Sequence, residues 1–312
     1  MQYSDLKGLN ISKLTLGTVQ LGMNYGIHNQ TGKPDAQSCM EILKTAEEGG
    51  VNCFDTAQAY GDSEVILGDY FSRQEQNGKH NLIVTKFSVT DSERLSSAEI
   101  EKQIYKLTGE SLERLKIEKI PVYMLHDFKD LILHSDIYVK TLKKLKNEGL
   151  IDKAGISVYS SAEVDKIIEF DVFETIQVPM NILDNRLVNS GSIERLAKNN
   201  YIIFVRSIFL QGLFFLKPEE LAGSLKVAGK YLIGLAGLAD AEGLSIAQLA
   251  VSYVRDISGV SSLVIGAETA GQVNENIKLI EAPPLSEKTR YEINKLFSEV
   301  PEEILVPYLW KC

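Results

Sequence analysis

Short apolar runs alternate along the chain with longer segments in which apolar residues recur at helical spacing. Residues 98–117 show the helical pattern, with apolar side chains three or four positions apart at Ile100, Ile104 and Leu107. Such alternation is typical of parallel βα units. Eight apolar runs are predicted to be strands: residues 14–17, 51–55, 82–86, 121–126, 153–157, 175–178, 202–206 and 263–266.

Polar residues and glycines mark where several predicted helices begin and end. Ser97 is predicted to cap the helix over 98–117 and Ser161 the helix that begins at 162, because a serine hydroxyl can accept a hydrogen bond from a free N–H of the first turn. Glycines follow residues 36–48 and 137–147, and a glycine in the left-handed conformation commonly ends a helix. The helices are therefore separated by short turns.

The number of units and the chain length together predict the fold. Eight βα units in 312 residues, with no linker rich in proline, glycine or serine, match the size of a (β/α)8 TIM barrel. We expect one barrel domain over residues 1–312. A doubly wound parallel sheet, which is built from the same units, is the alternative architecture.

The composition narrows the class of protein and of partner. The chain is 44% apolar and 24% charged, as is typical of a globular protein. Its 42 acidic and 33 basic side chains give a net charge of -9, which would repel the backbone of a nucleic acid. The three cysteines form no CxxC pair and predict neither a disulfide framework nor a metal site. We find no secretion signal and no run of about 18 apolar residues, so we expect a cytoplasmic protein without a membrane partner.

Four polar residues at or after strand ends carry the candidate chemistry. In a (β/α)8 barrel the loops at the carboxyl ends of the strands form the active site. Asp55 and Lys86 end neighbouring strands, and two buried opposite charges should pair. A lysine close to Tyr60 would stabilise its phenolate and make the phenol a general acid. His126, at the next strand end, could donate a hydrogen bond to a carbonyl oxygen.

Each of these four residues also has an ordinary structural interpretation when it is considered alone. Asp55 could cap a helix or be a salt-bridge partner, Tyr60 could be an aromatic residue of a turn, Lys86 could be a solvated strand end, and His126 could be a structural histidine. Their order along the chain favours catalysis. The order resembles that of the aldo/keto reductase superfamily, as do the segments DTAQAYGDSE (55–64), TKF (85–87), LHD (125–127), GIS (155–157), RSIFLQGL (206–213) and IGAETAGQVNEN (265–276).

The resemblance implies an enzyme that uses NAD(P)H to reduce an aldehyde or ketone to an alcohol, with Tyr60 as the acid. It also implies a cofactor site at the barrel mouth. The residues that would hold the nicotinamide are Gly17, Thr18, Asp55, Ser157 and Gln177, and those near the pyrophosphate are Ser207, Leu210 and Gly212. Arg206, which precedes that loop, could stack on the nicotinamide. Those near the adenosine are Gly266, Ala267, Gln272, Glu275 and Asn276.

The sequence departs from the family pattern at three places. Val158 follows Ser157 where many members have asparagine, which removes an amide from the nicotinamide site. Arg206 stands where many members have an aromatic residue, and it could bind a phosphate or an acidic substrate, or pair with a neighbouring carboxylate. The resemblance favours NADPH, but the 266–272 segment has no basic residue for a 2′-phosphate. Glu268 could repel that phosphate and favour NADH, or be a solvated loop charge.

Polar residues near the expected mouth bear on the substrate. Gln20, Tyr25, Asp127 and Arg206 favour a small hydroxylated, sugar-like or acidic carbonyl compound. Two other functions remain open at this point. One is a nicotinamide-binding sensor with little turnover, and the other is an isomerase or lyase whose bound NAD is reduced and reoxidised within each cycle.

Overall fold

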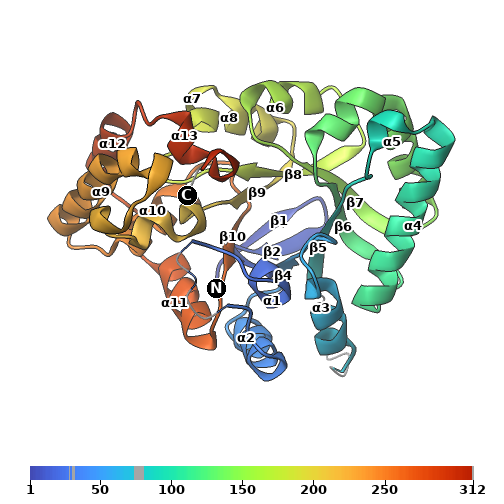
Figure 1. Ribbon diagram of the computed structural model, residues 1–312, viewed down its shortest axis with the longest axis horizontal. Helices are drawn as coiled ribbons and strands as arrows, with labels where there is room; N and C mark the ends of the chain where they lie inside the picture. Colours follow the sequence, from blue (N-terminus) through green and yellow to red (C-terminus); the bar gives the residue numbers. More distant parts are fainter. Residues whose placement is uncertain (28, 30–31, 74–80, 311–312) are drawn as a thin grey trace.

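Eight parallel strands close into a barrel in the computed structural model, which describes residues 1–27, 29, 32–73 and 81–310 (Figure 1). The last strand, β10, pairs with both β3 and β9, so the sheet has no free edge. This closure confirms the predicted (β/α)8 barrel and excludes the doubly wound sheet. The barrel strands are β3 (Leu14–Gly17), β4 (Cys53–Asp55), β5 (Leu82–Phe87), β6 (Ile120–Leu125), β7 (Ile151–Ser157), β8 (Phe173–Pro179), β9 (Ile202–Arg206) and β10 (Ser262–Gly266).

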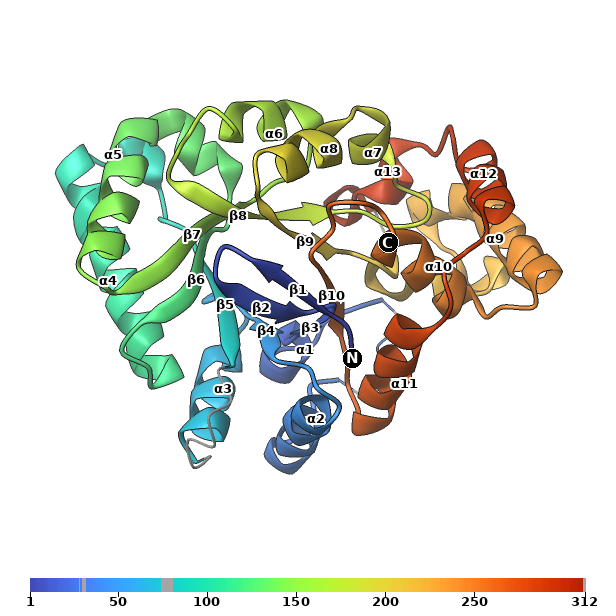
Figure 2. The ribbon, with the colours of Figure 1, turned by 180° about the vertical axis from the view of Figure 1, so that it is seen from behind.

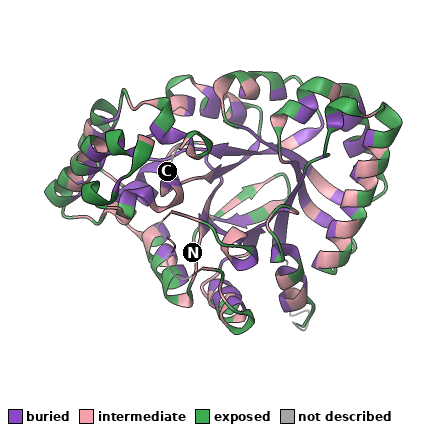
Figure 3. Cartoon of the chain, in the orientation of Figure 1, coloured by how far each residue is buried: buried purple, intermediate pink, exposed green. Residues whose placement is uncertain are grey.

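Helices surround the barrel and expose their outer faces, whereas the eight barrel strands are almost entirely buried (Figure 3). The α-helices are α1 (Val19–Gly22), α2 (Ala36–Glu48), α3 (Ser63–Ser72), α4 (Ser97–Leu115), α5 (Phe128–Asn147), α6 (Ser161–Ile167), α7 (Arg186–Asn189), α8 (Ser192–Lys198), α9 (Gly229–Glu242), α10 (Ile246–Arg255), α11 (Ala270–Glu281), α12 (Glu287–Leu296) and α13 (Glu302–Leu305). Short 3-10 helices are η1 (Ser92–Arg94), η2 (Leu210–Phe215), η3 (Pro218–Glu220), η4 (Gly223–Ala228) and η5 (Pro307–Leu309).

Two predicted helix caps were wrong by one residue. Ser96, not Ser97, caps α4, and Ser160, not Ser161, caps α6. Both serines form a capping box, in which the cap hydroxyl and a glutamate three residues later each bind the other's backbone N–H. Glu99 and Glu163 lie three residues after Ser96 and Ser160, and this spacing fixes the cap.

Helix α5 also begins earlier than predicted, at Phe128 rather than 137. The Asp127 carboxylate accepts a hydrogen bond from the Lys129 backbone N–H and caps this start. The helix is interrupted at His134, whose φ of -144° is not helical. The predicted segment therefore corresponds to the part of α5 that follows the break.

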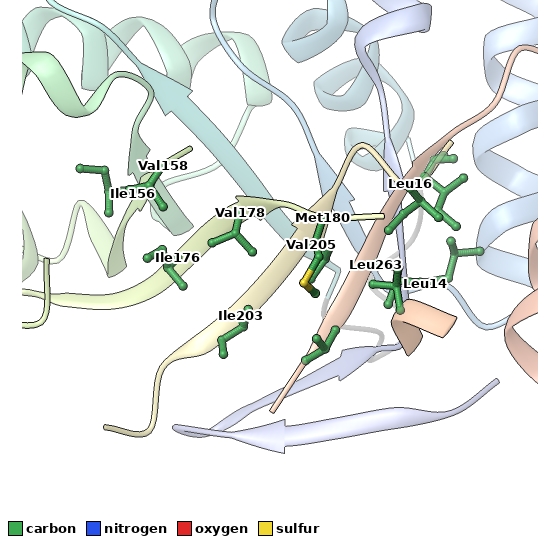
Figure 4. Packing of buried hydrophobic residues seen from close by; sticks show 14 of the residues in the cluster. Leu14, Leu16, Ile156, Val158, Ile176, Val178, Met180, Ile203, Val205 and Leu263 are labelled. Atoms are coloured by element: carbon green, nitrogen blue, oxygen red, sulfur yellow. The ribbon is translucent and has the colours of Figure 1, made fainter. Parts of the chain in front are cut away.

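Alternation along the strands divides the buried side chains into two groups. In β9, Ile203 and Val205 face the helices (Figure 4), whereas Ile202 and Phe204 belong to a separate cluster. Successive strand residues point to opposite faces, so this second cluster lies inside the barrel. Its buried members are Ile11, Cys53, Leu82, Val84, Val122, Met124, Ile202 and Phe204.

A hairpin that the sequence analysis did not predict closes the amino end of the barrel. Strands β1 (Tyr3–Leu6) and β2 (Leu9–Ser12) pair in antiparallel fashion and lie across the barrel in front of its strands in Figure 2. Ile11 is fully buried in the interior cluster, and the Asn52 side chain joins the hairpin to the start of β4. With this end covered, the carboxyl ends of the strands remain for a binding site.

Within the described residues, no individual helix has both the length and the apolarity needed to span a bilayer. The segment Gly223–Glu242 and helix α10 meet these criteria only as a pair, which is bent by 88°.

Candidate active site

Because successive side chains of a strand point to opposite faces, several polar side chains point into the barrel at the carboxyl ends of its strands. Asp55 lies two residues after Cys53, Lys86 two after Val84, and Arg206 two after Phe204. Since Cys53, Val84 and Phe204 all face the barrel interior, a step of two residues keeps the polar side chains on that interior face. Inside the barrel, a layer of polar side chains therefore lies next to the apolar cluster, on the side of the carboxyl ends of the strands.

Asp55 and Lys86 form the buried ion pair that the sequence predicts. The Lys86 side chain is 0% exposed and that of Asp55 is 5% exposed. Lys86 Nζ donates to both Asp55 carboxylate oxygens and to the Thr56 carbonyl, each at 2.8 Å. Gln177 Nε2, from β8, donates to Asp55 Oδ1 at 2.7 Å. All three ammonium protons thus have acceptors, as a buried charge requires.

The ring of Tyr60 lies close to both Lys86 and His126. Lys86 Nζ is 5.1 Å from the centroid of the Tyr60 ring. The Tyr60 and His126 rings are 5.9 Å apart and nearly perpendicular. The predicted four residues therefore lie together, although they come from three separate strand ends.

Two glycines hold the loop of Tyr60 against helix α1. A Cβ on Gly22 would lie 1.7 Å from the Tyr60 carbonyl oxygen, and a Cβ on Gly61 would lie 2.4 Å from the Gly22 carbonyl oxygen. Gly61 also has a φ of +55°, which favours glycine. Only hydrogen atoms fit at these two positions, so the backbone approaches closely there.

Buried hydroxyl groups join the same loop to the strand ends. Thr18 Oγ1 donates to the Asp55 carbonyl at 2.8 Å, and Ser63 Oγ donates to the Thr18 carbonyl at 3.0 Å. Thr56 Oγ1 donates to Ser63 Oγ at 2.8 Å. Sequence reasoning identified Thr18 but missed Thr56 and Ser63, which flank Tyr60 in the segment 55–64 and are fully buried.

His126 lies in an environment that disfavours its charged form. Burial lowers the pKa of His126 to about 3, and the positive charges of Lys86 and Arg206 act in the same direction. The imidazole is therefore neutral at physiological pH. A neutral imidazole has one N–H donor, which is what the polarisation of a carbonyl oxygen requires.

A cavity of about 570 Å³ opens over these residues, within the usual size of small-molecule sites. Predicted residues that line it are Gly17, Thr18, Gln20, Tyr25, Asp55, Tyr60, His126, Ser157, Gln177, Arg206, Ser207, Gly212, Gly266, Gln272, Glu275 and Asn276. Lining residues that sequence reasoning missed include Tyr159, Phe209, Gln211 and Phe215. Tyr159 follows Ser157 by two residues, and that spacing was a signal available in the sequence.

Four predicted residues do not line the cavity. Lys86 lies beneath it, within the ion pair. The Asp127 carboxylate caps α5 instead of facing a substrate. Leu210 is fully buried in the apolar core, where it anchors the loop that carries Ser207 and Gly212, and Ala267 is also buried in the core.

The cavity contains groups suited to a dinucleotide. Gln20 Oε1 is buried and has no hydrogen-bond partner within the described part of the chain. Its amide lies over Gly266, where a Cβ would approach it to 2.4 Å. Beyond Gly266 lies the start of α11, and a helix start offers backbone N–H donors and a positive dipole end. The residues present therefore fit an extended ligand with polar and anionic groups.

Comparisons with known proteins agree with this geometry. The sequence model of the aldo/keto reductase family matches residues 13–297. The uncharacterized oxidoreductase YqkF of Bacillus subtilis is 26% identical over 313 residues, covering 95% of each chain. D-arabinose 1-dehydrogenase of Saccharomyces cerevisiae is 27% identical over 227 residues, covering 68% of this chain and 64% of its own length.

Two solved structures have a similar fold. The holo form of aldo-keto reductase AKR11C1 from Bacillus halodurans has a TM-score of 0.76 at 24% identity and covers 95% of this chain and 96% of its own. Glycerol dehydrogenase AKR11B4 from Gluconobacter oxydans has a TM-score of 0.75 at 23% identity and covers 96% of this chain and 94% of its own.

The buried ion pair leads to a prediction about stability. Asp55→Asn should lower the free energy of unfolding by about 3–5 kcal/mol, because it leaves the Lys86 charge buried and uncompensated. Asp55→Asn/Lys86→Met should recover much of that loss. Urea denaturation measures both. Glu194→Gln, which breaks the exposed pair with Lys198, is the control and should cost less than about 1 kcal/mol; equal losses in the two single variants would contradict the prediction.

The shifted pKa of His126 leads to a second prediction. The folded-state pKa of about 3 lies below the ordinary value of 6.5, so the unfolded chain takes up this proton first as the pH falls. The contribution of His126 to stability is therefore lost from about pH 6.5 towards pH 3. In the folded protein its ring signals, assigned with His126→Gln, should not titrate by NMR between pH 8 and 5. A midpoint near 6.5 would show that the imidazole is accessible and unperturbed.

Proposed function

The chain belongs to the aldo/keto reductase family, and from this premise we propose that it reduces a small hydroxylated or sugar-like aldehyde or ketone with Tyr60 as general acid. As a member of the family it is an oxidoreductase that uses a nicotinamide cofactor and acts on small-molecule carbonyl compounds. The observation that carries the proposal is the position of the Tyr60 ring at the wall of the cavity, close to both the Lys86 ammonium and the His126 imidazole.

The reduction divides between cofactor and protein. The reduced nicotinamide, when bound, supplies the hydride that adds to the carbonyl carbon. Tyr60 donates its hydroxyl proton to the carbonyl oxygen as the electron pair of the C=O bond moves onto that oxygen, so the product is an alcohol. The nearby Lys86 charge stabilises the phenolate that remains, and solvent returns the proton. Asp55 keeps Lys86 in place.

His126 orients the substrate in this scheme. Its neutral imidazole donates one N–H to the carbonyl oxygen and holds that oxygen near the Tyr60 hydroxyl. With a pKa of about 3, the imidazolium form is too scarce to replace Tyr60 as the proton donor at neutral pH. The two residues therefore have separate roles.

The lining of the cavity supports a hydroxylated substrate. Gln20, Tyr25 and Gln211 line it together with Tyr159, and Gln211 Nε2 donates to the Tyr25 hydroxyl at 3.2 Å. Amide and phenol groups at such a wall can exchange hydrogen bonds with substrate hydroxyls. The name of the yeast relative, D-arabinose 1-dehydrogenase, is that of an enzyme for a polyhydroxylated compound and supports the same class.

We further propose that NADH is preferred to NADPH. The described lining residues from Gly266 to Leu279, where the adenosine is implied, include two carboxylates, Glu268 and Glu275, and no lysine or arginine. Gln272 Oε1 accepts a hydrogen bond from the Glu268 backbone N–H at 2.7 Å, which holds this turn at the start of α11. A 2′-phosphate would meet negative charge there, whereas a free ribose hydroxyl would not be repelled.

The general-acid role has a direct test. Tyr60→Phe should reduce kcat with a reactive aldehyde and NADH by about 10²–10⁴-fold, the range of general acid catalysis, while NADH binding measured by fluorescence is retained. Tyr105→Phe, which removes a hydroxyl bonded to Glu148 on the outer helices, should leave kcat unchanged. Full turnover in Tyr60→Phe would refute the mechanism, and a wild-type protein that binds NADH without turnover would favour a sensor or an internal redox cycle.

The cofactor preference is tested by exchanging charge at the adenosine end. Wild-type protein should show at least about tenfold higher kcat/KM for NADH than for NADPH, corresponding to about 1.4 kcal/mol. Glu268→Lys/Gln272→Arg should reverse the preference by supplying two partners for the 2′-phosphate. Glu287→Lys on the exposed start of α12 changes the net charge without touching the cavity and should not alter the ratio. A wild type that prefers NADPH would contradict the proposal.

A further inference from the structure

One cation in the cavity lacks a counter-ion. Among the described residues that line the cavity, the acidic ones are Asp55, Glu268 and Glu275, and Arg206 is the one with a positive charge at neutral pH. Asp55 is already engaged by Lys86 and Gln177. Within the described chain, no carboxylate lies within ion-pair distance of the Arg206 guanidinium. The alternative interpretation of Arg206 as a partner of a neighbouring carboxylate is therefore wrong.

This isolation distinguishes Arg206 from most arginines of the chain. Five other arginines form ion pairs with carboxylates: Arg114, Arg186, Arg195, Arg255 and Arg290. Arg206 Nη2 is buried and has no hydrogen-bond partner within the described residues, and its Nη1 reaches Ser207 Oγ only at 3.4 Å. A buried N–H of a charged group costs free energy unless something accepts from it.

Tyr159 holds the guanidinium in place without using its donors. The Arg206 guanidinium carbon is 4.3 Å from the centroid of the Tyr159 ring, and Tyr159 in turn contacts Tyr308 edge to face at 5.8 Å. Stacking occupies a face of the guanidinium plane, while its N–H donors lie in that plane. The contact with Tyr159 therefore satisfies none of the guanidinium N–H donors.

Arg206 acts at the same place as the proposed chemistry. Its positive charge contributes to the lowered pKa of His126 and opposes the rise that burial causes in the pKa of Tyr25. Both residues line the cavity with Tyr60. A small molecule whose carbonyl group reaches Tyr60 and His126 therefore lies within the field of Arg206.

We propose that Arg206 is a specificity-determining residue that binds an anionic group, a carboxylate or a phosphate, carried by a short carbonyl substrate. This inference rests on the proposed reductase function and makes its substrate class narrower. The guanidinium would donate to the oxygens of the anion, with the Tyr159 ring beside it. The substrate thus supplies the counter-ion that the cavity lacks.

The test compares substrates that differ only in charge. Succinic semialdehyde and its methyl ester form one pair, and glyceraldehyde 3-phosphate and glyceraldehyde form the other. Wild-type protein should use the charged member of at least one pair with a kcat/KM about 10- to 100-fold higher, the range expected for a charge-assisted hydrogen bond. The pair that shows this ratio identifies the anion as carboxylate or phosphate.

Variants at Arg206 then show whether this residue causes the ratio. In Arg206→Met the ratio should fall to near one, and Arg206→Lys should keep part of it because the charge remains without the planar fork. Arg195→Met removes an equal charge from α8, far from the cavity lining, and should keep the wild-type ratio. Ratios near one in the wild type, or an unchanged ratio in Arg206→Met, would overturn the inference while leaving the reductase function intact.

A binding measurement separates the inference from the proposed function. Calorimetric titration of the NADH-loaded protein with succinate and with inorganic phosphate should show binding of one anion that weakens at least about tenfold in Arg206→Met. If no aldehyde is turned over but this binding is present, the proposed function fails and the anion site stands. If neither anion binds in an Arg206-dependent manner and no aldehyde is turned over, both are wrong.

Discussion

The ion pair between Asp55 and Lys86 is the constraint on which the rest of the site depends. A lysine without solvent exposure needs an acceptor for each of its protons, and the structure provides two carboxylate oxygens and the Thr56 carbonyl. Those acceptors come from the neighbouring strand and the loop that follows it. Gln177 reaches the same carboxylate from β8, so one buried charge determines the relative positions of three strand ends.

The two ends of the barrel differ in the kind of side chain that fills them. Its amino end is filled by apolar side chains and covered by the hairpin of β1 and β2. Its carboxyl end carries the charged side chains of Asp55, Lys86 and Arg206 and the cavity, which Tyr159 also lines. Apolar burial at one end offsets the cost of desolvating charge at the other. The same two-residue period places both the apolar and the polar side chains inside the barrel, because each strand runs through both layers.

Much of this arrangement could be predicted from the sequence. The eight strands were found because each is a short apolar run, and the four candidate site residues because each stands at or after such a run. The hairpin was missed because each of its strands is only four residues long and contains no continuous apolar run. Three other features depend on the conformation of loops, which a periodic pattern does not determine. They are the burial of Leu210 in the core, the capping of α5 by Asp127 and the contact of Arg206 with Tyr159.

The contact between Gly22 and Gly61 affects how this scaffold can change. It fixes the loop of Tyr60, the proposed proton donor, by main-chain packing against α1 rather than by contact with the side chains that line the cavity. Tyr25, Gln211 and Phe215 contribute to those walls and lie outside the contact. If Tyr60 is the general acid, substrate preference can therefore diverge, in nature or in a mutant library, without displacing the Tyr60 hydroxyl. By contrast, a side chain at either glycine would shift that hydroxyl whatever compound is bound. The residues that could change substrate preference and the residues that position the Tyr60 loop thus lie in different segments of the same barrel mouth.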